Sequence, residues 1–216
     1  MARGKPGLWS AVLGLPFVAA GAWLYYGQSQ YPPTVGVPFA LFGAFVVAIG
    51  AYVHTIGTPE ELRLQEGERM IARRHPTQRV ALVKVASGLP LLAATGYLLV
   101  FARAPPLYSA ATLLVGLYLY SVGLYTYWTN TLTNYYVTNK RVVKEFRFRS
   151  LVRREVPLQK VRGVQERKSL VEALVGLGNV RVSGGDGSFV MQNVGRSGKF
   201  ADTIRKLLAS GFEGRT

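Results

Sequence analysis

The chain has 216 residues, of which 49% are hydrophobic and 17% charged, and 26 Lys and Arg against 11 Asp and Glu give a formal net charge of +15. A soluble domain of this size rarely combines these values, whereas an integral membrane protein that faces anionic lipid commonly does. The absence of cysteine excludes disulfides and thiol chemistry. With two histidines and no clustered acidic residues, we expect no metal, no cofactor and no enzyme activity.

Four apolar stretches are long enough to cross a bilayer, because about 20 residues at a 1.5 Å rise span a hydrocarbon core about 30 Å thick. The predicted spans are Leu8 to Tyr26, Val35 to Ile56, Val80 to Ala102 and Leu107 to Trp128. They divide the chain into an N-terminal transmembrane hairpin (1–56), a loop (57–79), a second transmembrane hairpin (80–128) and a C-terminal domain (129–216).

The charges outside the spans predict the orientation. The loop 57–79 carries five arginines, and the segment after Trp128 holds 17 of the 26 basic residues. By the positive-inside rule we expect a multi-pass protein of the plasma membrane with both termini in the cytoplasm. Residues 20–22 also fit a signal-peptide cleavage site, and cleavage there would leave three spans with the new N-terminus outside.

Small residues recur every seven positions in each span. The four sets are Gly7, Gly14 and Gly21; Gly36, Gly43, Gly50 and Gly57; Ala81, Gly88 and Thr95; and Ser109, Gly116 and Gly123. Seven residues are close to two helical turns, so each set forms one stripe that lets helix backbones approach closely in lipid. The pattern predicts packed helices.

The segment after the fourth span changes to the two-residue rhythm of β-strands. Strands are predicted at 131–138, 141–149, 151–156, 161–167, 179–183 and 188–194, followed by an amphipathic helix at 198–210. In the second of these strands Lys144 is a misfit, because it shares a face with Val142, Phe146 and Phe148. The "GGDG" at 184–187 favours a hairpin turn over a phosphate loop.

Residues 67–76 leave two interpretations open. They read as a seventh strand, but "TPEE" at 58–61 is also a helix-start signal, so a helix could run through the whole loop. If the strand forms, the third and fourth spans are an insertion in the first connection of a small barrel. The domain would then be attached to the membrane at two points.

The segment "TNYYVTNKRVVKEFRFRSLVRREVPLQKVRGVQERKSLVEALVGLGNVRVSG", together with "LQEGERMIARRHP", resembles the membrane-anchored bacterial and archaeal pleckstrin-homology-like (PH-like) domain family over about 62–76 and 131–208. The matching residues are Gly67, Glu68, Tyr136, Thr138, Arg141, Val142, Pro157, Leu158, Val161, Val164, Gly176, Gly178 and Val180. The resemblance implies a seven-stranded β-barrel with a C-terminal capping helix, and it implies no catalytic activity. Together with the four transmembrane helices predicted from the apolar runs, of which the first two lie outside the matched pattern, we expect an α+β membrane protein with a cytoplasmic PH-like domain.

Two functions remain open. In the first, the PH-like domain recruits an unknown protein or contacts anionic phospholipid headgroups through Arg147, Arg149, Arg153 and Arg154, since eukaryotic relatives of the fold hold phosphoinositides at this turn. These arginines could also be an ordinary solvated face. In the second, the chain is a transporter or channel component with a regulatory cytoplasmic domain, although its spans contain no carboxylate. We expect no small-molecule substrate and no nucleic acid, because the aromatic residues fall at core positions. A homo-oligomer stays open.

Overall fold

The computed structural model describes residues 5–27, 32–56, 62–102, 105–169, 173, 176–185 and 187–213. The chain divides into two compact units, Met1–Thr58 and Pro59–Thr216, and each is described by itself. The predicted helix-start signal at 58–61 falls outside the described residues, and Asp186 of the predicted turn also lies outside them.

The N-terminal unit is a helical hairpin of α1 (Pro6–Tyr26) and α2 (Gly36–Ile56), with the short 3-10 helix η1 (Pro33–Val35) before α2. The glycine stripes form its interface. A Cβ added to Gly43 would lie 2.5 Å from the carbonyl oxygen of Gly14, and one added to Gly21 would lie 2.5 Å from the backbone nitrogen of Ala40. Only glycine permits this approach, so the predicted close packing is confirmed for this pair.

The second hairpin consists of α3 (Arg79–Val100) and α4 (Pro106–Thr131) and belongs to the larger unit. Its stripe also packs backbone against backbone, since a Cβ on Gly123 would lie 2.5 Å from the nitrogen of Val85. Within the described residues, all four predicted spans are helices long and apolar enough to cross a membrane. The chain is therefore described as a multi-pass membrane protein.

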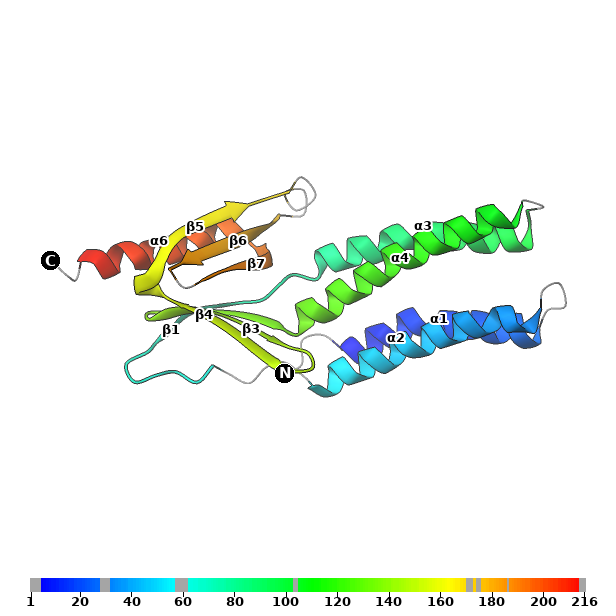
Figure 1. Ribbon diagram of the computed structural model, residues 1–216, viewed down its shortest axis with the longest axis horizontal. Helices are drawn as coiled ribbons and strands as arrows, with labels where there is room; N and C mark the ends of the chain where they lie inside the picture. The colour runs from blue at the N-terminus through cyan, green and yellow to red at the C-terminus, as the bar shows by residue number, and fades with distance from the viewer. Residues whose placement is uncertain are drawn as a thin grey trace. The chain divides into compact units, whose positions relative to one another are not determined.

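Residues 70–74 form a strand, which settles the alternative that the sequence left open. β1 (Met70–Arg74) pairs antiparallel with β2 (Thr133–Thr138), and α3 and α4 lie between them in the chain. The second hairpin is thus inserted in the first connection of the β domain, as predicted for the strand interpretation. The domain is joined to its hairpin at two points (Figure 1).

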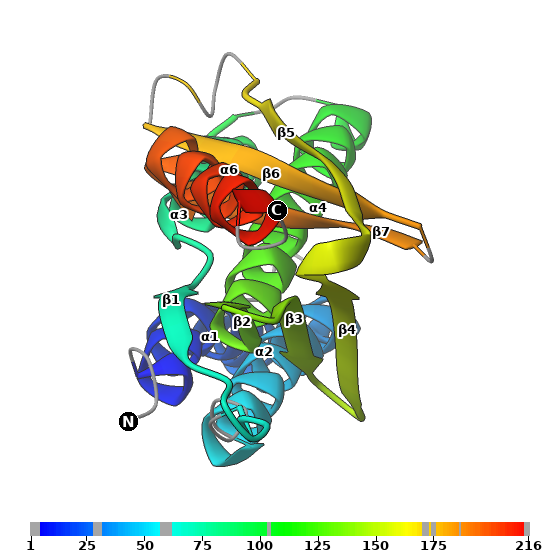
Figure 2. The same ribbon diagram turned by 90° about the vertical axis from the view of Figure 1, so that its left-hand side faces the viewer.

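Two further strands continue this first sheet, in the order β1-β2-β3-β4, through β3 (Arg141–Arg147) and β4 (Leu151–Pro157). After the 3-10 helix η2 (Leu158–Lys160), a second sheet has the order β5-β6-β7, with β5 (Val161–Arg167), β6 (Leu177–Gly184) and β7 (Gly187–Gly195). Gly184 pairs with Gly187, so the predicted hairpin turn is confirmed. The closing helix α6 (Ser197–Glu213) lies across the second sheet (Figure 2).

The expectation of a closed seven-stranded barrel is wrong in one respect: the seven strands form separate sheets of four and three. At the edge of β7, side chains of the first sheet take the place that a paired strand would have in a closed barrel. The Tyr135 hydroxyl donates to the Gln192 carbonyl (3.3 Å) and accepts from the Gln192 N–H (2.9 Å). The Lys144 ammonium donates to the Val190 carbonyl (3.0 Å). These bonds satisfy backbone groups that strand pairing would otherwise satisfy.

The core lies between the two sheets and α6. It contains valines of both sheets together with Tyr135, Phe189, Met191, Phe200 and Ile204, all at most 6% exposed. Phe200, Ile204, Leu207 and Leu208 supply the apolar face of α6 that the helical spacing predicts.

The two connections between hairpin and domain are bonded to each other. The Gln78 amide donates to the Tyr127 carbonyl (3.2 Å) and to the Thr131 hydroxyl (2.8 Å), and the Asn130 amide donates to the Thr77 carbonyl (3.1 Å). The start of α3 and the end of α4 are thereby held together. This fixes the β domain relative to the second hairpin.

Candidate functional site

The turn between β3 and β4 lies at the end of the domain that α4 enters. Only Leu132 separates the end of α4 at Thr131 from the start of β2, and Thr133 of β2 is opposite Phe146 of β3. The Arg147 N–H also donates to the Leu132 carbonyl (3.2 Å). The turn at 148–150 therefore emerges beside the last turn of a predicted transmembrane helix (Figure 1).

The four predicted site arginines all belong to this β3–β4 hairpin, but they do not share a face. Arg147 is opposite Leu151, Arg153 is opposite Glu145, and Arg154 is opposite Lys144. Because side chains alternate along a strand, Arg147 and Arg153 lie on one face and Arg154 on the other. Arg149 is exposed in the turn.

Arg153 differs from the other three because an acidic residue neutralises it. Its guanidinium lies 2.6 Å from the carboxylate of Glu145, whose side chain is 1% exposed. This pair was not predicted from the sequence. Strand alternation could have found it, since a turn centred near residue 149 makes 145 and 153 cross-strand neighbours.

Two apolar side chains accompany the arginines at the start of β4. Leu151 and Val152 are 52% and 42% exposed. An apolar tip beside cationic side chains is the composition that favours the boundary between lipid headgroups and acyl chains.

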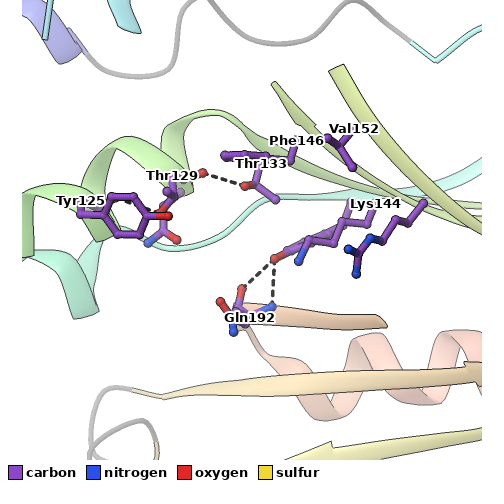
Figure 3. Close-up of a pocket in the computed structure, with 10 residues that line it drawn as sticks. Tyr125, Thr129, Thr133, Lys144, Phe146, Val152 and Gln192 are labelled. Atoms are coloured by element: carbon purple, nitrogen blue, oxygen red, sulfur yellow. Dashed lines mark hydrogen bonds between the residues drawn. The ribbon is translucent and has the colours of Figure 1, made fainter. Parts of the chain in front are cut away.

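Behind the hairpin, a cleft of about 300 Å³ opens between the end of α4, the first sheet and β7. Figure 3 shows Lys144 reaching into it beside Gln192, with Tyr125 and Thr129 contributed by α4. The lining residues are Tyr125, Thr129, Asn130, Thr133, Tyr135, Lys144, Phe146, Val152, Arg154 and Gln192. Burial, and secondarily the charge of Arg154, lowers the pKa of Lys144. The misfit lysine of the sequence therefore faces a cleft.

A second polar cluster joins the β2–β3 turn to the segment ahead of β1. The Glu68 carboxylate accepts hydrogen bonds from Arg141 (2.9 and 3.1 Å), from the Thr138 hydroxyl (2.7 Å) and from the Gln65 N–H (2.7 Å). Burial alone would raise the pKa of Glu68, but these bonds outweigh it and lower the pKa to about 2. Three residues that carry the family resemblance thus form one structural clamp.

The family comparison agrees with this architecture. The bacterial PH domain family matches residues 77–209, which is more than half of the chain, and the protein belongs to that family. The match includes both helices of the second hairpin and begins after β1. No curated protein and no solved structure matches the chain. Among the described residues no group of three or more His, Cys, Asp or Glu is arranged to hold a metal ion.

Proposed function

We propose that this protein is a non-enzymatic component of the plasma membrane, with both termini in the cytoplasm, whose PH-like domain contacts anionic phospholipid headgroups through the β3–β4 hairpin. One observation carries the proposal: the backbone bond from Arg147 to Leu132 ties the hairpin to the last turn of α4. The domain therefore has a fixed membrane-facing end, and that end carries the arginines.

The length of α4 supports a shallow position for the hairpin. Its 26 residues extend for about 39 Å, compared with about 30 Å for the hydrocarbon core and 40–45 Å for the whole bilayer. The last turns of α4 thus lie among the headgroups. The turn at 148–150 is then within reach of lipid phosphates.

The charge of the hairpin determines how strongly an anionic leaflet attracts it. A basic residue near an anionic leaflet contributes about 1 kcal/mol. Arg147 and Arg149 form no ion pair within the described residues, whereas Glu145 neutralises Arg153 and Arg154 lies on the opposite face, in the cleft. The total for Arg147 and Arg149 is about 2 kcal/mol. Because the helices already anchor the chain, this energy orients the domain rather than recruits it.

An acidic surface of a partner protein would be attracted by the same hairpin. The test must therefore distinguish recruitment of such a protein from contact with lipid headgroups. No observation of the described spans favours the transporter or channel function.

Amide hydrogen exchange of the full-length protein in lipid nanodiscs tests the proposal. In discs with anionic lipid, amides 147–152 should exchange more slowly than in zwitterionic discs, and high salt should remove the difference. Amides of α6 provide the control and should exchange equally in both. Equal exchange of the hairpin in both lipids would contradict lipid contact and favour a protein partner.

A further inference from the structure

The cleft behind the hairpin has the composition of an anion site. Lys144 on β3 and Arg154 on β4 are directly opposite each other and both line it, and no acidic residue is among the lining residues. Arg154 forms no ion pair within the described part of the chain, and Lys144 has the Val190 carbonyl as its hydrogen-bond acceptor. Two neighbouring cations without a carboxylate repel each other, and an anion between them removes that repulsion.

The remaining hydrogen-bonding groups in the cleft fit an acceptor-rich ligand. An ammonium has three N–H donors and a guanidinium five, so bonding to Val190 leaves Lys144 with donors to spare. The Tyr125 hydroxyl and the Gln192 side-chain amide add neutral donors from α4 and β7 (Figure 3). By contrast, the Thr129 and Thr133 hydroxyls already donate to carbonyls of α4, at 2.9 and 2.6 Å.

The volume of the cleft limits the size of the ligand that it can hold. About 300 Å³ is at the small end of ligand pockets and accommodates a phosphate with a small alcohol attached. Tyr125 and Thr129 belong to the last two turns of α4, so the cleft opens at the depth of the headgroups if the proposed function holds. Phosphates are favoured over carboxylates, because they offer three or four acceptor oxygens to converging cations.

We propose that this cleft binds a phosphate group through Lys144 and Arg154, with Tyr125 and Gln192 as neutral donors. The phosphate comes from an anionic phospholipid of the adjacent leaflet or from a free phosphate compound. The cleft site rests on the proposed function only for its depth in the membrane. It uses residues on the inner face of the hairpin, whereas the orienting contact uses Arg147 and Arg149.

Binding to the purified full-length protein in detergent micelles tests this site. The probes are dioctanoyl phosphatidylglycerol, glycerol 1-phosphate and inorganic phosphate, titrated by calorimetry. Arg154→Gln should weaken binding about ten- to hundredfold, because a hydrogen bond to a charged group contributes 1.5–3 kcal/mol. Lys144→Met should do the same while keeping most of the side-chain volume. Arg181→Gln is the control, since Arg181 is an exposed arginine of β6 that is not among the lining residues of the cleft, and binding should be unchanged.

The outcomes distinguish the sources of the phosphate and the two proposals. Binding of all three probes indicates a phosphate site open to free compounds, and binding of the lipid alone indicates a headgroup site. No binding of any probe, or equal binding by the wild type and Arg154→Gln, would overturn the cleft site. Arg154 is exposed and outside the core, so the Arg154→Gln variant should fold. The comparison of Arg154→Gln with the wild type therefore tests the cleft site even if Lys144→Met fails to fold. Loss of the cleft site would leave the salt-dependent protection of the hairpin unaffected.

Discussion

Glu68→Gln tests the clamp between the segment ahead of β1 and the β2–β3 turn. The Glu68 side chain is 0% exposed in its ion pair with Arg141, and its pKa is lowered from 4.5 to about 2. Since each pKa unit is equivalent to about 1.36 kcal/mol, this lowering corresponds to about 3 kcal/mol of stability at neutral pH. Glutamine keeps the shape but loses the charge, so we expect most of this energy to be lost.

Hydrogen exchange of the β2 and β3 amides in detergent micelles measures the effect as a lower free energy of opening. A group with a lowered pKa contributes its stability above its unfolded pKa and loses it as the pH falls through the folded pKa. The difference between wild type and Glu68→Gln should therefore be constant above about pH 5 and shrink from about pH 4.5 to about pH 2.

The ion pair of Asp202 with Arg205 supplies the control, because these side chains are 60% and 53% exposed. Asp202→Asn should change the free energy by less than about 1 kcal/mol. A difference under about 1 kcal/mol for Glu68→Gln at pH 7, or one that does not shrink in acid, would refute the assignment of the clamp.

Two further predictions concern the hairpin of β strands and the packing of the helices. Arg153→Ala leaves the Glu145 carboxylate buried without its partner, so thermal unfolding should show that the free energy of unfolding falls by about 1–3 kcal/mol. Arg149→Ala should lower it by at most about 0.5 kcal/mol. Equal losses would contradict the difference between these arginines. Gly43→Leu forces α1 and α2 apart, because a Cβ there lies 2.5 Å from a backbone carbonyl of the facing helix. The helical signal should unfold at least about 1 kcal/mol more easily than in the lipid-facing control Phe45→Leu, and equal unfolding would count against close packing.

Much of the fold could be predicted because its signals are local. Runs of about 20 apolar residues define the helices, and the seven-residue spacing of Gly14, Gly21 and Gly43 marks the faces that pack. Alternation defines the strands, and the 161–167 strand has its predicted bounds.

The sequence could not decide what depends on long-range contacts. Residues 70–74 carry both strand and helix signals, and only pairing with β2, about 60 residues further along the chain, selects the strand. The barrel stays open because Tyr135 and Lys144 bond to the edge of β7, which no local pattern predicts.

The candidate site shows the same division. The sequence identifies the four arginines of one hairpin, but their distribution over two faces needs the register of β3 with β4. Lys144 stands out in the sequence as a misfit, yet its cleft is formed by α4, the first sheet and β7 of the second sheet together. The neutralisation of Arg153 depends on the burial of Glu145, which the residue pattern alone does not reveal.

Contact of the β3–β4 hairpin with anionic headgroups can be measured directly as the depth of a spin label. The chain contains no cysteine, so Ser150→Cys gives one labelling site in the exposed turn, and Gln159→Cys gives a matched exposed site at the opposite end of β4. In nanodiscs with anionic lipid, the label at 150 should be accessible to oxygen at headgroup depth, and Arg147→Gln with Arg149→Gln should raise it out of the bilayer. The label at 159 should stay in water throughout. A label at 150 that remains in water in anionic as well as in zwitterionic nanodiscs would contradict contact of the hairpin with the headgroups.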